Sequence, residues 1–464
     1  MNVAVAGIPK TIDNDIDHID RTFGFQSAVE AAQAAIRAAK TEATCNLPNG
    51  IGIVKLMGRS AGFIAAFATL GSGDVDLCLV PEVPIELEGE HGVLPHLFER
   101  VQQKGYAVVV VAEGAGEELL GTSAETDASG NKKLPAIGAF MKKTAEEYFE
   151  KQGETATVKY IDPSYMVRSV PANAADTLYC MELAQNAVHG MMAGFTGFSV
   201  ALCNNKMVML PIPNLVATSP RHMDPNGRTW EREVAMTRQP NLSKDSHISQ
   251  ESSVDKFPGT LLSDIKIRNI YLSEIEHLSA KFESEAPAGF KNTMHDVDYY
   301  EDSIPTVKAK PNAFLRMSTM MADFTLFNGS KRSGTEYNKL ISESECVIYD
   351  HVLKPGTDID LRAFIRAGPR RELHFNPKTV NAAIVTCGGL CPGLNNVIRS
   401  LTHSLLFEYG IKGKVWGIRG GFSGFYNDKY PPIVLTPELV ENIHHKGGSK
   451  SSLGIYIDVI ISST

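Results

Sequence analysis

Three aspartates follow a short apolar stretch at the start of the sequence. The segment GIPKTIDNDID (residues 7–17) places Asp13 and Asp15 two positions apart, behind a rigid Gly-Ile-Pro turn. Two carboxylates in one cleft can divide their work: one takes a proton from an alcohol, and the other holds a metal or orients the first. Lys10 adds a point charge suited to phosphate, and Thr11 adds a hydroxyl. A solvated Asp/Asn-rich turn fits the same residues, so both alternatives stay open.

Two arginines stand in motifs that could bind a phosphate or a sugar. Arg59 lies in MGRSAG (residues 57–62), just after an apolar run, and Arg168 lies in SYMVRS (residues 164–169). Ordinary surface arginines explain these motifs equally well.

The segment CGGLCPGLNN (residues 387–396) lies between a predicted strand and a predicted helix. Small residues in that position let backbone N–H groups approach a phosphate, and the helix N-terminus adds a favourable dipole. A tight strand-to-helix turn also needs glycine, so the motif alone is weak evidence. No G-x-x-x-x-G-K-[ST] or G-x-G-x-x-G occurs, which argues against a P-loop NTPase and a dinucleotide enzyme.

The elements that would position these residues alternate between strand and helix. Unbroken apolar runs are typical of strands buried on both faces of a parallel sheet. They occur at residues 51–54, 77–80, 107–111 and 382–386. Helical spacing appears at 25–39, 166–193 and 396–409, and further strands are predicted within 197–211 and at 414–418. The sequence therefore predicts an α/β fold.

The middle and the end of the chain differ from this pattern. Residues 242–306 are polar and serine-rich, which predicts a poorly ordered linker. Residues 307–380 are mixed, with one predicted strand at 347–349. The last ten residues lack a cap or turn that would complete a structural unit.

Composition limits the classes of function. The 464 residues are 43% hydrophobic and 21% charged, as in soluble globular proteins, and the net charge of −8 argues against nucleic acid as a partner. No apolar run approaches the roughly 18 residues that a membrane span needs. The seven cysteines are scattered, and no secretory signal is visible, so we expect a reduced, cytoplasmic protein.

The motifs together resemble the phosphofructokinase family. The resemblance is carried by GIPKTIDNDI, KLMGRSAGFIA, VAEGAG, YIDPSYMVR, VTCGGLCPGLNNVIR and RAGPRRELHF. It is nearest to the plant- and trypanosome-type ATP-dependent branch and covers roughly residues 1–241 and 330–454.

The resemblance implies a phosphofructokinase-like fold with two Rossmann-like parallel-sheet domains, but with the halves in reversed order. Residues 1–241 resemble the second part of a core, with the catalytic loop and the sugar-phosphate-binding domain. Residues 307–380 resemble the N-terminal extension of a following unit, and 381–464 resemble the truncated first part, the nucleotide-binding region. The family's GGDGT segment is missing, so we expect an incomplete nucleotide domain without a central strand. A window on a tandem fusion, or a gene model joining neighbouring units, would explain this order.

The resemblance also implies glycolytic 6-phosphofructokinase activity: transfer of the γ-phosphoryl group of ATP to the 1-hydroxyl of fructose 6-phosphate, with Mg²⁺ as cofactor, in a cytoplasmic homo-oligomer. The implied catalytic residues are Asp13, Asp15 and Lys10. The implied substrate-binding residues are Thr11, Asp13, Met57, Gly58, Arg59, Glu113, Lys159, Tyr165 and Arg168, with Lys159 reaching across a subunit interface. Gly389 and Arg419 fall where the family binds the nucleotide. The expected metal ligand would lie in the missing segment.

Two alternatives remain open. Pyrophosphate could replace ATP, because the residue that distinguishes the donors belongs to the missing segment. The chain could also be a catalytically impaired fragment or a non-catalytic subunit that binds sugar phosphate. We expect its turnover to be poor, because the magnesium aspartate is missing.

Overall fold

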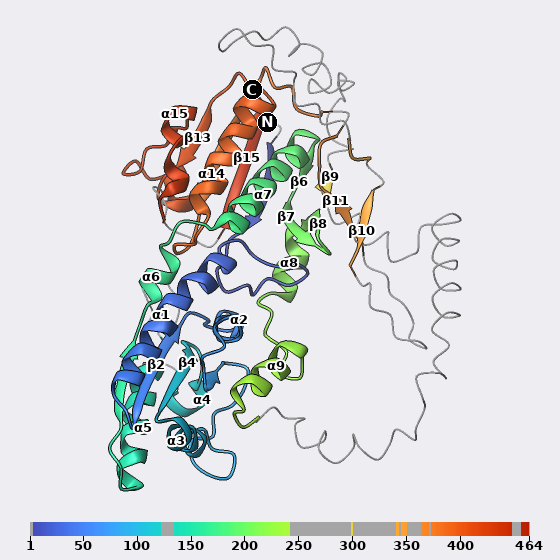
Figure 1. Ribbon diagram of the computed structural model, residues 1–464. Helices are drawn as coiled ribbons and strands as arrows, with labels where there is room; N and C mark the ends of the chain where they lie inside the picture. Colours follow the sequence, from blue (N-terminus) through green and yellow to red (C-terminus); the bar gives the residue numbers. More distant parts are fainter. Residues whose placement is uncertain are drawn as a thin grey trace, which may run out of the picture.

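The structure consists of two lobes, each built on its own β-sheet (Figure 1). The computed structural model describes residues 3–121, 134–241, 298–299, 340–342, 345–349, 363–370, 373–447 and 456–463. Each lobe has its own hydrophobic core, and Ile12 packs against both cores. Ile12 belongs to the aspartate-rich segment, which therefore lies where the lobes meet.

The larger sheet has nine strands in the order β10-β11-β8-β7-β1-β15-β12-β13-β14. Their bounds are β1 (Val3–Pro9), β7 (Phe198–Cys203), β8 (Lys206–Pro211), β10 (Cys346–Ile348), β11 (Ala363–Arg366), β12 (Val380–Thr386), β13 (Val415–Ile418), β14 (Ile433–Val434) and β15 (Tyr456–Ser463). The sheet thus combines strands from 1–241, 307–380 and 381–464. The short strands β6 (Phe195–Thr196) and β9 (Asp298–Tyr299) pair separately.

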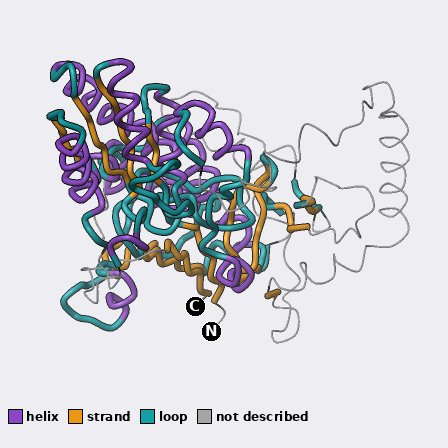
Figure 2. Tube along the Cα trace, turned by 90° about the horizontal axis from the view of Figure 1, so that it is seen from below, coloured by secondary structure: helices purple, strands orange, loops and turns teal. Residues whose placement is uncertain are grey.

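The centre of this sheet corrects the prediction of two parallel-sheet domains. Strand β15 lies between β1 and β12 and is antiparallel to both, with Val5 and Ala383 opposite Ile460. The larger sheet is therefore mixed, while β1 and β12 run in the same direction. The prediction that no strand fills this place was also wrong, since the C-terminal residues form it. The two ends of the chain consequently lie side by side (Figures 1 and 2).

Buried and half-buried side chains alternate along β15, and this pattern explains how the strand packs on the larger core. Val459 and Ile461 are fully buried in the larger core, whereas Ile460 and Ser462 are half-buried. β-Branched residues in a period-2 pattern suit a strand that packs one face on a core.

The smaller sheet is fully parallel, in the order β3-β4-β2-β5. Its strands are β2 (Gly50–Leu56), β3 (Leu77–Leu79), β4 (Tyr106–Ala112) and β5 (Thr157–Ile161), which confirms the predicted runs at 51–54, 77–80 and 107–111. The edge strand β3 is covered by a side chain: the Gln239 amide accepts a hydrogen bond from the Cys78 N–H (2.7 Å) and donates one to the Cys78 carbonyl (2.8 Å).

The helices pack on these sheets as the alternation predicts. Their bounds are α1 (Phe25–Cys45), α2 (Phe63–Ser72), α3 (Val93–Lys104), α4 (Glu117–Leu120), α5 (Ile137–Lys151), α6 (Ser164–Arg168), α7 (Ala174–Met192), α8 (Ile212–Thr218), α9 (Arg228–Thr237), α14 (Leu394–His403) and α15 (Pro437–Val440). Helix α14 continues as a π-helical turn at Ser404–Glu408, close to the predicted end at 409. Helix α1 packs on β2, and α7 packs on β1 and α14.

The proposed linker at 242–306 lies outside the described residues except for β9. From 307–380, the structure describes β10, β11, the start of β12 and short flanking segments. The predicted strand at 347–349 corresponds to β10.

The central position of β15 predicts how much its side chains contribute to stability. We expect Ile461→Ala to lower the free energy of unfolding by about 2–5 kcal/mol, because it leaves a cavity in the larger core. The matched change Ile460→Ala, on the half-buried face, should cost clearly less. Urea unfolding of both variants measures this difference. Equal losses would mean that β15 does not pack as described.

Candidate active site

We call residues 10–20, for which the family resemblance implies a catalytic role, the catalytic loop. This loop begins where β1 ends. The Thr11 hydroxyl donates a hydrogen bond to Asp15 Oδ1 (2.7 Å) and accepts one from the Asp13 N–H (3.2 Å). Asn14 and His18 have left-handed backbones, with φ of 59° and 62°. These local bonds curl the loop so that Asp13 and Asp15 lie close enough to interact electrostatically.

The Asp13 side chain is partly buried, and its Oδ1 is shielded from solvent and has no hydrogen-bond partner among the described residues. Burial, together with the charges of Asp15 and Glu113, raises the pKa of Asp13 from 3.8 to about 7, while Arg59 opposes the rise. Arg59 acts through its charge and a backbone hydrogen bond. A carboxyl that titrates near neutrality and keeps one oxygen unpartnered is suited to accept a proton.

The Met57–Arg59 turn and Glu113 come from adjacent parallel strands. Met57 follows β2 and Glu113 follows β4, and the Glu113 N–H donates a hydrogen bond to the Leu56 carbonyl (2.9 Å). Gly58 has φ of 134°, and a Cβ there would come within 2.5 Å of the Ala61 carbonyl oxygen. Only glycine suits this backbone, so the tight turn presents Arg59 beside Asp13.

Positive side chains gather around Glu113. Burial raises the pKa of Glu113, and the charges of Lys55, Arg59 and Arg168 oppose that rise. Arg168 stacks over the Tyr165 ring at 4.8 Å, and its buried Nε has no hydrogen-bond partner among the described residues. An arginine with donor capacity to spare, next to a second arginine, is a suitable anchor for a phosphate group.

Lys10 joins the catalytic loop to the glycine-rich turn. Its amine donates a hydrogen bond to the Gly389 carbonyl (2.7 Å) across 379 positions of sequence. Lys10 is only 4% exposed, and burial lowers its pKa. This contact brings the Asp13 loop and Gly389 together at one edge of the sheet that contains both β1 and β12.

The structure leaves two of the predicted site residues apart from the group around Asp13. Lys159 is exposed on the edge strand β5, and Arg419 is exposed at the end of β13. Tyr165 is 74% exposed, although Arg168 covers its ring.

A segment that sequence reasoning missed borders the site. The segment consists of residues 219–223. Ser219 and Arg221 form hydrogen bonds with the catalytic loop, His222 with the Ser60 carbonyl next to Arg59, and Met223 with Glu82. The sequence offers no signal for this role, because many of the partners are backbone groups.

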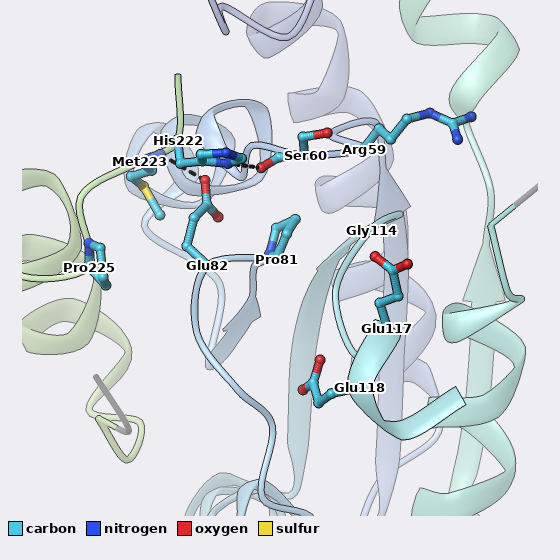
Figure 3. A pocket seen from close by; sticks show the side chains of 10 residues that line it. All are labelled: Arg59, Ser60, Pro81, Glu82, Gly114, Glu117, Glu118, His222, Met223 and Pro225. Carbon is cyan, nitrogen blue, oxygen red and sulfur yellow. Dashed lines mark hydrogen bonds between the residues drawn. The ribbon is translucent and has the colours of Figure 1, made fainter. Parts of the chain in front are cut away.

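A cavity of about 690 Å³ opens between this segment and the Arg59 turn. It is lined by Arg59, Ser60, Pro81, Glu82, Gly114, Glu117, Glu118, His222, Met223 and Pro225 (Figure 3). The Arg59 side chain extends away from the glutamates (Figure 3). Across the described residues, no group of three or more His, Cys, Asp or Glu side chains is arranged to hold a metal ion.

The buried Asp13 carboxyl predicts a pH-dependent cost in stability. Between the ordinary pKa of 3.8 and about 7, the folded protein binds a proton that the unfolded chain releases, so stability falls as pH rises. Asp13→Asn removes this loss, which amounts to at most about 1.4 kcal/mol per pH unit.

We therefore expect Asp13→Asn to be more stable than the parent protein at about pH 8 and similar to it near pH 4, in thermal unfolding. The exposed substitution Glu117→Gln on α4 is the control. Parallel pH profiles for the parent protein and Asp13→Asn would contradict the buried environment of Asp13.

Comparisons with known proteins show which family this chain belongs to. The family model described as Phosphofructokinase matches residues 1–191 and 381–454. The chain is 50% identical over 242 residues to the chloroplastic ATP-dependent 6-phosphofructokinase 5 of Arabidopsis thaliana, which covers 52% of this chain and 45% of the relative. It is 48% identical over 266 residues to ATP-dependent 6-phosphofructokinase 1 of the same plant, covering 56% of each protein.

The ATP-dependent 6-phosphofructokinase of Trypanosoma cruzi is 44% identical over 258 residues, covering 54% of this chain and 52% of that protein. The chain thus spans about half the length of the curated relatives it matches. No helix in the described parts combines the length and apolar character needed to cross a membrane. Because the family model matches more than half of its residues, this chain belongs to the phosphofructokinase family.

Proposed function

We propose that the protein is an ATP-dependent 6-phosphofructokinase. It transfers the γ-phosphoryl group of ATP to the 1-hydroxyl of fructose 6-phosphate and yields fructose 1,6-bisphosphate. The observation that carries this proposal is the Asp13 carboxyl, which has a shielded, unpartnered oxygen and lies between the arginines of one lobe and the glycine-rich turn of the other.

Asp13 is the proposed general base. Its pKa of about 7 means that a substantial fraction is ionised at neutral pH, while the ionised form stays basic enough to accept a hydroxyl proton. Asp15, oriented by Thr11, lies beside it, and its charge helps to raise the pKa of Asp13. As the proton moves to Asp13, the sugar oxygen attacks the γ-phosphorus of ATP, the bond from that phosphorus to the β–γ bridging oxygen breaks, and ADP leaves.

The sugar phosphate is proposed to bind on the side of the smaller lobe. Arg59 and Arg168 supply charge for its phosphate, and Glu113 accepts hydrogen bonds from its hydroxyls. Thr11, Met57, Gly58 and Tyr165 complete this pocket. Lys159 would serve a neighbouring subunit in a homo-oligomer.

The nucleotide is proposed to bind at the edge where β12 and β13 end. Gly389 lets the triphosphate approach the main chain, since a Cβ there would meet no atom within 4 Å. Lys10 supplies positive charge near the transferred group, whose negative charge spreads over its oxygens in the transition state. Arg419 lies at the same edge.

Mg²⁺ accompanies ATP in such transfers and is usually held by one or two carboxylates together with phosphate oxygens. The described residues do not supply a three-ligand site, so no step here is assigned to a protein-bound ion. All seven cysteines are free thiols, which supports a reducing compartment, and we propose the cytoplasm.

The alternative is a non-catalytic protein that binds sugar phosphate. The relatives named ATP-dependent 6-phosphofructokinase support the enzyme rather than this alternative. Two measurements distinguish it from the enzyme.

The first measurement is turnover. In a coupled assay with Mg-ATP and fructose 6-phosphate, we expect activity that Asp13→Ala lowers by about 10²–10³-fold, because the fixed base is lost. Activity that is indistinguishable between the parent protein and Asp13→Ala would support the non-catalytic alternative. Pyrophosphate in place of ATP tests the other donor.

The second measurement is binding. Calorimetry should detect fructose 6-phosphate binding, and Arg168→Met should weaken it by at least about tenfold, since a charge-assisted contact to phosphate contributes about 1.5–3 kcal/mol. The exposed Lys143→Met on α5 is the control. Binding of Mg-ATP should be weaker than binding of the sugar phosphate. Tight Mg-ATP binding without any affinity for fructose 6-phosphate would reverse the assignment of the pocket.

A further inference from the structure

We propose that Arg221 is the positioning residue of the site: it fixes the main chain of the catalytic loop and thereby holds the Asp13 carboxyl at its place between the lobes. The inference deepens the proposed function and rests on it for its kinetic test.

Arg221 makes three hydrogen bonds to the catalytic loop, and all three acceptors are backbone carbonyls. Its N–H donates to the Asp15 carbonyl (2.7 Å), its Nε to the Asn14 carbonyl (3.0 Å) and its Nη1 to the Ile19 carbonyl (3.0 Å). The three carbonyls span the loop on the C-terminal side of Asp13. Arg221 therefore fixes the path of the main chain that carries both proposed catalytic carboxylates, through one backbone bond and two side-chain bonds.

The loop needs such a clamp because its conformation is unfavourable on its own. Asn14 and His18 adopt left-handed backbones, which persist in non-glycine residues only when the surroundings over-determine them. Further contacts support the clamp: the Asn14 side chain accepts a hydrogen bond from the Thr22 N–H (2.9 Å), and the Ser219 hydroxyl accepts one from the Asp17 N–H (3.1 Å).

The guanidinium of Arg221 is itself held against the other half of the site. It lies over the Phe63 ring at 5.2 Å from its centroid, and Phe63 begins α2 directly after the Arg59 turn. A planar guanidinium can stack on a ring and still donate from its edge, which a lysine ammonium cannot do. Arg221 therefore contacts the loop that carries Asp13 and the element that follows Arg59.

The next two residues bind the Arg59 turn directly. His222 Nδ1 lies 2.7 Å from the Ser60 carbonyl oxygen. Glu82 Oε1 accepts hydrogen bonds from the Met223 N–H (2.8 Å) and the Gly62 N–H (2.9 Å), so one carboxylate joins the two segments. Figure 3 shows His222 and Met223 facing Ser60 and Glu82. The chain from 219 to 223 thus sets how the catalytic loop lies relative to Arg59.

The kinetic test compares Arg221→Lys and Arg221→Met with the parent protein. We expect Arg221→Lys to lower kcat by about 10–100-fold, as for a misplaced catalytic group, while the KM for fructose 6-phosphate changes less than about threefold. Arg221→Met should lose more. Arg228→Lys is the matched control, since Arg228 begins the following helix α9, is exposed and pairs with Glu231 (2.8 Å). An unchanged kcat, or a rise in KM alone, would overturn the proposal.

A second test does not need turnover, so it separates failure of this inference from failure of the proposed function. The free energy of unfolding of the protein with Asp13 and of Asp13→Asn is measured as a function of pH, first with Arg221 present and then with Arg221→Lys. The quantity compared is the difference between the two pH profiles in each case. If Arg221 holds Asp13 in its buried position, the difference shrinks markedly in the Arg221→Lys background and stays unchanged with Arg228→Lys. If that difference has the same size with Arg221 and with Arg221→Lys, and the substitution only lowers stability equally at every pH, Arg221 has a structural role and the proposal that it positions Asp13 is refuted. Absence of turnover in the parent protein would contradict the proposed enzyme alone.

Discussion

The main-chain hydrogen bonds along β15 hold the candidate site together. They join β1 on one side and β12 on the other, so strands that are more than 370 positions apart belong to one sheet. Because β1 and β12 run in the same direction, their C-terminal ends reach the same edge, where Lys10 meets Gly389. A slip of one residue in either ladder would turn Val459 and Ile461 away from the core and displace one half of the site relative to the other. The spacing between the halves is therefore determined by backbone pairing.

The surroundings of Asp13 show how the fold trades stability for reactivity. Burial and the nearby acids Asp15 and Glu113 disfavour the ionised carboxyl of Asp13 and raise its pKa, whereas Arg59 favours the ionised form and lowers the pKa. The resulting pKa near neutrality makes the group a usable base, but the folded state must hold a carboxyl that water would solvate better. Such a group persists only because the loop around it is fixed by several independent contacts, among them Thr11 with Asp15 and Arg221 with the loop carbonyls.

Much of the fold could be predicted from the sequence, since unbroken apolar runs such as 107–111 directly indicate buried parallel strands, and long motifs identify the family. The position of β15 could not be predicted in this way. The pattern of Val459 and Ile461 fits a strand but does not specify its neighbours or its direction. In the site, the residues of GIPKTIDNDID and MGRSAG were found because their types suggest chemistry. Arg221 was missed because its partners are carbonyl groups, which every residue carries, and the burial of Asp13 depends on packing between segments far apart in sequence.

The Gln239 side chain on β3 has a consequence for association between molecules. An edge strand with open N–H and C=O groups can accept a strand from another chain, which leads to aggregation or swapped assemblies. On β3, the amide of Gln239 already occupies both main-chain groups of Cys78, as a neighbouring strand would. Gln239 lies just after α9, which packs on α2 and β3, so this packing places the amide against β3. A second chain could extend the smaller sheet at Cys78 only by first displacing Gln239.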